Sequence, residues 1–323
     1  MAGASDLANP CRAPLIAWAG KAPLKGPVGI AFSAGADSTA LLLAAHALWP
    51  GQVVGLHVNH GLQAAAAGFE QHAINFGRQI GAPVLTCNAA AGPQPGQSPE
   101  DAARRARYGA LAMLAREHGL VSVWLAQHQD DQLETVVLAL SRGSGVAGLA
   151  GMSPRFEIGG VRFERPILDV STQAIREWLL ASGHPFVDDP TNLDLRFTRN
   201  RIRHEVTPIL RASFPHIAAM VARSSQHMAQ AQELLDEIAA EDAERVGLPP
   251  QIKALQSLSA ARQSNLLRMW IKAESGSAPS QAQLQALLHQ VQACQTRGHG
   301  IELKVSAGYV TRDGEKLSYQ SNL

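Results

Sequence analysis

A short segment of small and hydroxyl residues carries the first sign of chemistry in this chain. It follows an apolar run at 28–32, precedes a helical pattern at 38–48, and consists of Ser33, Ala34, Gly35, Ala36, Asp37 and Ser38. A strand, a tight turn and a helix start direct backbone N–H groups and the positive helix end to one point, which favours phosphate or pyrophosphate. The carboxylate of Asp37 is suited to hold Mg²⁺ beside such phosphates. The segment matches neither common phosphate loop, so a small turn whose Ser and Asp cap the helix is an alternative of about equal weight.

A second group of polar side chains, His57, Asn59 and His60, closes the apolar run at 53–58. Two imidazoles and an amide at a strand end can contact a nucleotide base or ribose, or they can order the turn. The residue types leave both interpretations open.

Acidic and imidazole groups crowd the start of another helical pattern, at 128–135. They are His128, Asp130, Asp131 and Glu134. One residue is enough to cap a helix, so the surplus favours a cation, an amine or a base as a partner. Asp131 and Glu134 are three positions apart and share one helix face. An ammonium group fits electrostatically between them.

Two clusters of arginine have both a plain and a specific interpretation. Arg104 and Arg107 share a helix face with Glu100. That face is either a solvated Glu–Arg ladder or the place where an arginine holds a phosphate or carboxylate. Downstream, four arginines surround one aromatic residue, at Arg196, Arg199, Arg201 and Arg203. They form a basic helix face or a surface for the phosphates of nucleic acid.

The elements that position these groups alternate regularly. Short apolar runs at 28–32, 53–58, 84–87 and 121–126 are separated by helical patterns at 38–48, 66–80, 100–118 and 130–140. This order predicts an α/β domain with a doubly wound, mainly parallel sheet. Ligands of such sheets bind beyond the carboxyl ends of the strands. The polar groups described above follow strand ends or begin helices, so we expect them to meet at that edge.

The pattern changes near 205–215, where Pro208 and Pro215 lie. We therefore predict a catalytic domain at 1–210 and a smaller, mainly helical domain at 211–323. A glycine-containing hairpin at 156–164 and a helix capped by Ser171 complete the first domain. The second has helical patterns and then short strands, at 217–240, 260–273, 281–295, 301–305, 308–310 and 316–319. Its segment 251–323 carries 8 basic and 4 acidic side chains, which is compatible with a polyanionic partner.

Composition limits the class of protein. The chain has 323 residues, of which 46% are hydrophobic and 17% charged, as in soluble globular proteins. It contains no apolar run of the roughly 18 residues that span a bilayer and no export pattern, so we expect a cytoplasmic protein without a membrane partner. Three widely spaced cysteines, Cys11, Cys87 and Cys294, argue against a disulfide scaffold and against cysteine metal or iron–sulfur sites.

Taken in order, the motifs resemble those of the tRNA(Ile)-lysidine synthetase family within the PP-loop ATP pyrophosphatase superfamily. Residues 33–38 are similar to S-G-G-x-D-S, 57–62 to H-V-x-H-G-L, 100–108 to E-x-x-A-R-x-x-R-Y, 126–135 to A-H-H-x-D-D-Q-x-E-T, 142–152 to R-G-x-G-x-x-G-L-x-G-M, and 197–203 to F-x-R-N-R-I-R. The match spans residues 28–205, which is far more than isolated motifs give by chance.

The resemblance implies an adenine nucleotide α-hydrolase-like fold and a ligase. Such an enzyme uses ATP to adenylate carbon 2 of the wobble cytidine in an isoleucine tRNA with a CAU anticodon. The ε-amine of free lysine then displaces AMP and gives lysidine. A homodimer is a further expectation.

The resemblance also assigns roles to individual residues. It implies that Ser33, Ala34, Gly35, Ala36, Asp37, Ser38 and His60 bind ATP, with Mg²⁺ on Asp37. Arg107, Asp131 and Glu134 would bind lysine, and the catalytic set would be Asp37, Arg107, His128, Asp131 and Glu134. Arg199, Arg201 and Arg203 would hold tRNA phosphates.

Two positions depart from the family pattern. Ala34 replaces the first glycine, which is harmless at negative φ but costs about 1 kcal/mol or more in a left-handed conformation. Gln127 replaces the first histidine, so a titrating role of that histidine does not carry over. The alternatives are a cytidine thiolase of the same superfamily, which needs cysteine pairs, an amidotransferase-type synthetase, and a non-catalytic tRNA-binding protein.

Overall fold

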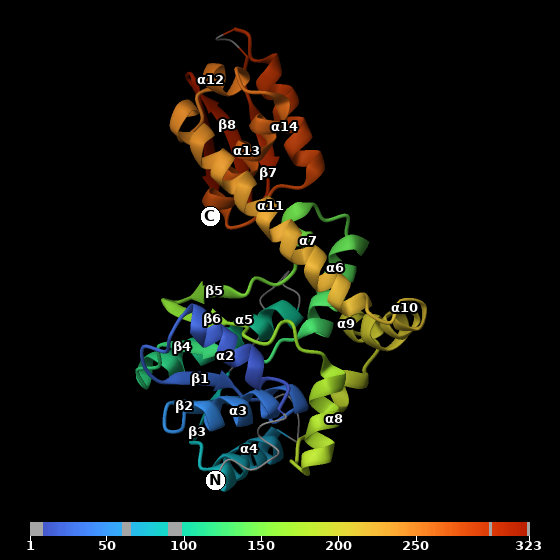
Figure 1. The fold of residues 1–323 in the computed structure, drawn as a ribbon. Coiled ribbons are helices and arrows are strands. Elements are labelled where there is room, and N and C mark those ends of the chain that lie inside the picture. The colour runs from blue at the N-terminus through green and yellow to red at the C-terminus, as the bar shows by residue number, and fades with distance from the viewer. Residues whose placement is uncertain (1–8, 60–65, 90–98, 297–298, 322–323) are drawn as a thin grey trace. The chain divides into compact units, whose positions relative to one another are not determined.

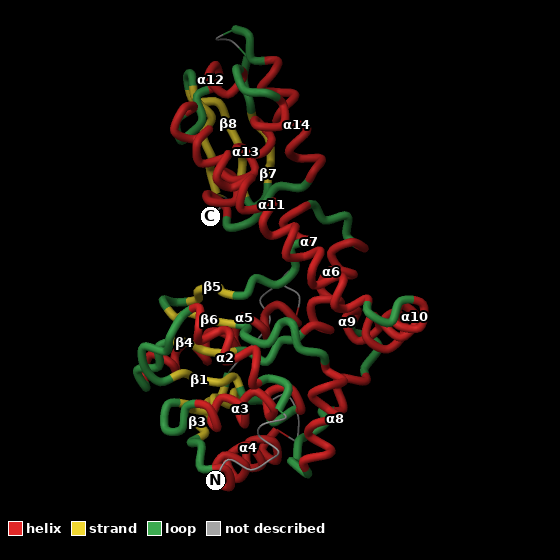
Figure 2. Tube along the Cα trace, in the orientation of Figure 1, coloured by secondary structure: helices red, strands yellow, loops and turns green. Residues whose placement is uncertain are grey.

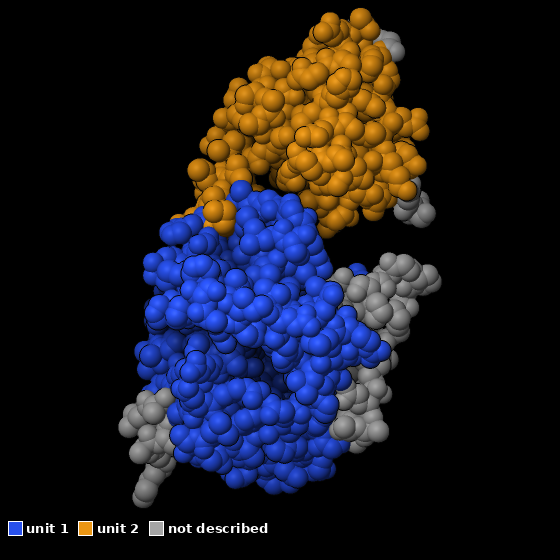
Figure 3. All heavy atoms as spheres, turned by 90° about the vertical axis from the view of Figure 1, so that its right-hand side faces the viewer, with its two compact units in different colours: residues 1–227 blue, residues 228–323 orange. Residues whose placement is uncertain are grey.

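The chain forms two compact units, Met1–His227 and Met228–Leu323 (Figure 3). The computed structural model describes residues 9–59, 66–89, 99–296 and 299–321. The units divide inside the helix α11, Ile217–Val246, and therefore beyond residue 210. The domain boundary at 210 stays a prediction. Within the described ranges, no helix is both long and apolar enough to cross a membrane.

A six-stranded sheet organises the first unit, with the order β3-β2-β1-β4-β6-β5 (Figure 1). The strands are β1 Val28–Ala31, β2 Val53–Asn59, β3 Val84–Asn88, β4 Ser122–Trp124, β5 Arg155–Ile158 and β6 Val161–Glu164. All neighbouring pairs are parallel except β5 with β6. The predicted doubly wound, mainly parallel sheet is confirmed. Strand order reverses at β1 and β4, and a crevice opens beyond strand ends at such a point.

Helices cover both faces of this sheet. One apolar core joins it to α2 Arg12–Lys21, α3 Ala36–Leu48, α4 Ala66–Ile80 and α8 Thr172–Ser182. A second core, which includes Leu111 and Phe163, joins the opposite face to α5 Pro99–Glu117. The sequence pattern did not predict α2, which contains Pro14 in its first turn. Proline is tolerated in the first turn of a helix, where it costs no intrahelical hydrogen bond.

The remaining segments of the first unit surround the carboxyl edge. The predicted hairpin is confirmed, with Gly159 and Gly160 at φ 56° and 75° in its turn. Ser171 caps α8 as expected, by accepting from the N–H of Ala174. The other helical elements are α6 Gln129–Ser141, α7 Val146–Leu149, a 3₁₀ turn Pro190–Leu193, α9 Thr198–Arg201, a π-helix Ile202–Val206, and α10 Thr207–Ser213.

The second unit combines helices with a small antiparallel sheet (Figure 2). Besides the end of α11 it contains α12 Ile252–Gln256, α13 Ala260–Ser275, α14 Gln281–Ala293, β7 Glu302–Val305, β8 Gly308–Asp313 and β9 Lys316–Ser321. Trp270 of α13 is buried in its core with Leu284 and Leu317. Ser280 caps α14 reciprocally with Gln283, as the sequence predicts. The predicted helical region ending in short strands is confirmed.

The turn after β1 contains a strained alanine. Ala34 has φ 66° and is fully buried. Its carbonyl accepts from the Val187 N–H at 2.9 Å and from Thr39 Oγ1 at 3.4 Å, so the surrounding structure holds it in place. A left-handed L-residue costs about 1–2 kcal/mol. Alanine in place of the family glycine is therefore unfavourable here, because the residue has positive φ.

We predict that Ala34→Gly raises the free energy of unfolding by about 1 kcal/mol, because glycine adopts positive φ without a Cβ clash. Urea unfolding of the unliganded protein measures the change. The matched control is Ala36→Gly in the first turn of α3, which should lower stability by up to about 1 kcal/mol. If both glycine substitutions destabilise alike, Ala34 is not strained.

Candidate active site

The turn between β1 and α3 leaves the start of that helix open. The side chains of Ser33 and Ser38 bond to each other at 3.2 Å, and Ser38 Oγ donates to the carbonyl of Gly35 at 3.1 Å. In this described segment, no side chain caps α3, whose N-cap is Gly35. The first N–H groups of a helix need an external partner when no cap serves them. The alternative that Ser and Asp side chains cap this helix is therefore wrong for the described turn. A phosphate can bind the free N–H groups at the helix start in place of a cap.

Asp37 stands in the first turn of α3 with one engaged and one free oxygen. Its Oδ2 lies 3.4 Å from His128 Nε2. Its Oδ1 is buried and has no hydrogen-bond partner in the described part of the chain. An orphaned carboxylate oxygen beside a phosphate-binding helix start fits Mg²⁺, which takes one or two protein carboxylates and completes its shell with phosphates and water. Among the described residues, no group of three or more His, Cys, Asp or Glu could hold a metal without such help.

His128 is the N-cap of α6, and its side chain connects the segment after β4 with the turn after β1. Its Nδ1 accepts from the N–H groups of Asp130 at 3.2 Å and Asp131 at 3.5 Å, while Asp131 Oδ2 accepts from the His128 N–H at 3.1 Å. Its Nε2 lies 3.4 Å from Asp131 Oδ2 as well as from Asp37. One imidazole thus connects the β1 turn to the acidic start of α6. This contact follows from the adjacency of β1 and β4.

Opposing effects act on the protonation of His128. Burial lowers its pKa, but the carboxylates of Asp131, Asp37 and Asp130 outweigh burial and raise the pKa to about 9. The hydrogen bonds that Nδ1 accepts from the helix N–H groups oppose protonation of the ring at Nδ1, because a protonated Nδ1 cannot accept an N–H. The observed capping geometry describes the ring with its proton on Nε2, which faces Asp37 and Asp131.

The acidic residues at the start of α6 have different partners. Asp130 turns away to accept from the Thr172 N–H at 2.9 Å and to pair with Arg211. Burial raises its pKa, but the bond from Thr172 and the charge of Arg211 lower it below its ordinary value. Asp130 therefore serves the structure, and Asp131 and Glu134 remain for a ligand.

Two arginines occupy the space beside this acid pair. Arg199 Nε donates to Glu134 Oε2 at 3.0 Å, and Arg203 Nε donates to Glu134 Oε1 at 2.6 Å. Arg203 also lies 3.4 Å from Asp131 Oδ1. The Glu134 side chain is 2% exposed. The sequence predicts a cation between these acids, and in the unliganded structure the chain's own guanidinium groups provide it.

The other predicted site residues lie in different settings. Arg107 is exposed on α5, with its guanidinium 6.0 Å from the Tyr108 ring centroid, and it makes no ion pair within the described ranges. Arg201 is exposed and donates to Thr198 Oγ1 at 3.3 Å. His60 lies outside the described residues. Instead of one basic helix, the structure has the short α9 followed by a π-helix, and Arg199 and Arg203 pair with Glu134 while Arg201 is exposed.

Two buried polar residues behind the site were not singled out by the sequence. Gln132 accepts from the Met152 N–H at 2.7 Å and donates to the Met152 carbonyl at 3.2 Å, which anchors the glycine-containing loop. Arg165, which directly follows β6, donates to the side chain of Gln127. Neither has a local sequence signal, because both partners come from distant parts of the chain.

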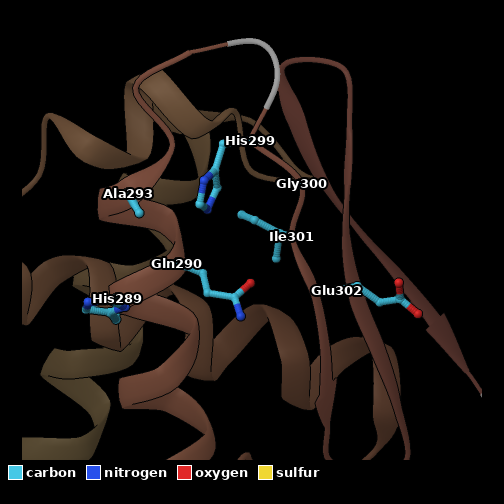
Figure 4. Close-up of a pocket in the computed structure, with 7 residues that line it drawn as sticks. All are labelled: His289, Gln290, Ala293, His299, Gly300, Ile301 and Glu302. Carbon is cyan, nitrogen blue, oxygen red and sulfur yellow. The ribbon is translucent and has the colours of Figure 1, made fainter.

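A pocket of about 610 Å³ lies in the second unit, between α14 and the start of β7 (Figure 4). Its lining is His289, Gln290, Ala293, His299, Gly300, Ile301 and Glu302. None of the candidate site residues lines it.

Comparisons with known proteins decide the family. A family model described as a PP-loop domain matches residues 19–210, and one described as a TilS substrate binding domain matches 251–317. The tRNA(Ile)-lysidine synthase of Polaromonas naphthalenivorans is 53% identical over 91% of this chain and 89% of that protein. The chain belongs to the tRNA(Ile)-lysidine synthase family. The synthase of Bordetella parapertussis is 40% identical over 90% of this chain and 88% of its own length.

A solved structure confirms the fold of this family member. The U34-tRNA thiolase NcsA from Methanococcus maripaludis, with its [4Fe-4S] cluster, superposes with a TM-score of 0.57 at 15% identity. It covers 68% of this chain and 78% of its own. At this identity the likeness shows shared architecture alone.

The raised pKa of His128 predicts a pH-dependent stability. The ordinary pKa of about 6.5 applies when unfolded. Protonation therefore stabilises the fold fully below about pH 6.5, and this contribution is lost as pH rises through about 9. His128→Asn keeps a capping side chain but does not titrate. We therefore compare the free energies of unfolding of the wild type and the variant. The difference, wild type minus variant, should decrease by no more than about 3 kcal/mol as the pH rises from 6.5 to 9.

Urea unfolding of both unliganded proteins at several pH values tests this. A difference that stays constant across this range would show that the cap keeps the ring neutral.

Because Glu134 pairs with Arg203 and not with Arg201, replacing these two arginines should change the free energy of unfolding by different amounts. Arg203→Ala should lower the free energy of unfolding by about 3 kcal/mol, because it leaves a buried carboxylate short of a partner. Arg201→Ala, the matched control, should change it by less than about 0.5 kcal/mol. Denaturant unfolding measures both.

The double variant Arg203→Ala with Glu134→Gln separates the causes. It should recover part of the loss, because the uncompensated charge is gone. No recovery would mean that Arg203 stabilises through packing.

Proposed function

We propose that the protein ligates free lysine to carbon 2 of the wobble cytidine in an isoleucine tRNA with a CAU anticodon. The oxygen on that carbon takes the adenylyl group of ATP as pyrophosphate leaves. The lysine ε-amine then bonds to the carbon, and AMP departs with the oxygen to give lysidine. One observation carries the proposal: His128 Nε2 lies 3.4 Å from both Asp37 and Asp131, which joins the phosphate-binding turn to the acid pair. Membership of the lysidine synthase family supports the reaction.

Adenylation belongs to the β1 turn. Ser33, Ala34, Gly35, Ala36, Asp37 and Ser38 present the uncapped helix start to the phosphates of ATP, and His60 belongs to the same nucleotide site by family resemblance. Mg²⁺ on Asp37 would neutralise charge on the departing pyrophosphate. His128 holds the carboxylate of Asp37 from behind.

Lysine binding belongs to Asp131, Glu134 and Arg107. The two acids hold an ammonium group of lysine, and Arg107, which has no acidic partner among the described residues, takes the carboxylate. Because both oxygens of Glu134 already accept from guanidinium groups, lysine must replace Arg199 or Arg203 there. The attacking amine must lose a proton, and a carboxylate of this pair accepts it. His128, which resemblance to the family puts in the catalytic set, already carries a proton on Nε2 and caps α6 with Nδ1, so its role is to hold Asp37 and Asp131.

Transfer RNA binding involves Arg199, Arg201 and Arg203 together with the second domain. An arginine that releases Glu134 to lysine becomes available for a phosphate, so the two assignments agree. The segment matched by the substrate binding domain model lies in the basic part of the chain. A homodimer and a cytoplasmic location complete the proposal.

A cytidine thiolase is the alternative that the chemistry of this chain does not favour. The similar thiolase structure holds a [4Fe-4S] cluster. Here Cys11 and Cys294 are buried in different units, Cys87 is partly buried, and all three are free. A sulfur-transfer cluster has no cysteine set to bind it.

The proposal is tested by incubating the protein with ATP, radiolabelled lysine and tRNA transcripts. We expect label only in the isoleucine tRNA with a CAU anticodon, and not in a transcript whose wobble cytidine is replaced. Failure of the folded protein to incorporate lysine would refute the proposal.

Two variants should divide the reaction. Asp37→Asn should abolish release of pyrophosphate, because it removes the metal-binding charge. Asp131→Asn should leave adenylation of tRNA in place and raise the KM for lysine about tenfold or more, the scale of one charge-assisted bond. An unchanged lysine KM in Asp131→Asn would remove Asp131 from the lysine site.

A further inference from the structure

Arg165 is a buried cation for which the proposed reaction has no assigned use. It is 5% exposed and lies directly after β6, at the carboxyl edge of the sheet. Its Nε donates to Gln127 Oε1, its Nη1 donates to the Ser153 carbonyl, and its guanidinium lies 4.3 Å from the Phe156 ring centroid. Within the described ranges it forms no ion pair with a carboxylate. A buried charge without a counter-ion costs several kcal/mol, so a purely structural role would be served better by a neutral residue.

Arg165 lies beside a pair of rings that carries two more guanidinium groups. Phe156 packs edge-on against Tyr108 with ring centroids 5.5 Å apart, and Arg104 and Arg107 lie 5.8 Å and 6.0 Å from the Tyr108 centroid. Burial lowers the pKa of Arg165, and Arg104 lowers it further, while Tyr108 and Asp131 oppose both. Three guanidinium groups around this pair of rings create a positive potential that an anion can compensate.

The acid pair lies on α6, whose N-cap His128 directly follows Gln127, the hydrogen-bond partner of Arg165. The acid pair supplies negative charge, and the guanidinium groups near Tyr108 supply positive charge. Together they match an amino acid that carries both an ammonium group and a carboxylate. The phosphates of ATP have their own place at the β1 turn. The carboxylate of lysine is therefore the anion that this arrangement favours.

We propose that Arg165 is a positioning residue of the lysine site, whose fixed positive charge beside the Phe156 and Tyr108 rings strengthens binding of the lysine carboxylate. This inference rests on the proposed function. Arg165 is held by Gln127 and Ser153 and acts through its charge, without contacting lysine. Gln127, where the family has a histidine, provides a neutral acceptor that leaves this charge uncompensated.

The experiment compares lysine with lysinamide, in which the carboxylate is a neutral amide. In the full chain with ATP and tRNA, Arg165→Met should raise the KM for lysine about fourfold, the scale of a charge that acts without direct contact. The KM for lysinamide should change less than about twofold, because no anion is involved. Arg165→Lys, which keeps the charge, should restore most of the lysine affinity. The matched control is Arg162→Met, an exposed position on β6.

Each outcome has a defined meaning. An equal rise in KM for lysine and lysinamide would show a merely structural role and overturn the inference, as would no change at all. A rise in the KM for ATP alone would assign the charge to phosphate. If Arg165→Met does not fold, Arg165→Gln serves as the second neutral variant and retains donors to Gln127 and Ser153. Absence of lysine incorporation by the wild type would instead refute the proposed function.

Discussion

The carboxylate of Glu134 imposes the constraint on which the rest of the site depends. A charge that is 2% exposed must be paired, and it takes both Arg199 and Arg203 to satisfy its two oxygens. These arginines are four positions apart, on one side of a helical stretch that passes from α9 into a π-helix. The chain between α8 and α10 is thereby held against α6. Removing the acid would free that segment as well as empty the ligand site.

The same charge balance explains why the site can be stable without substrate. Asp37 and Asp131 face His128, Asp130 faces Arg211, and Glu134 faces two guanidinium groups. Each carboxylate therefore has a positive or proton-bearing partner before any ligand arrives. In the proposed lysine site, an entering ammonium would exchange one cation for another and so avoid the cost of a newly buried unpaired charge. Phosphates bound as proposed at the β1 turn would meet mainly N–H groups in the described part of the chain, which is why a metal ion on Asp37 would suit them.

Much of this was accessible from the sequence because it is encoded locally. Apolar runs and helical periods gave the parallel strands, the hairpin at Gly159 and Gly160, and the cap at Ser280. Since β1 and β4 are neighbours in a doubly wound sheet, the meeting of Asp37 and His128 also followed. The pairing of Glu134 with residues 65 and 69 positions away did not follow, because no local pattern encodes it. For the same reason a row of arginines suggested a solvent-facing surface, although two of them turn inward.

Ala34 and Arg165 show why the least predictable residues gather near the site. Each is locally unfavourable: one is an L-residue at φ 66°, the other a buried cation without a carboxylate partner in the described structure. Local rules of propensity and burial argue against both, so they persist only because distant contacts hold them, Val187 and Thr39 in one case and Gln127 and Ser153 in the other. In the sites proposed above, a strained turn would present its N–H groups to phosphate, and a cation without a paired carboxylate would attract an anion. In both proposals the locally unfavourable feature is the one that favours the ligand.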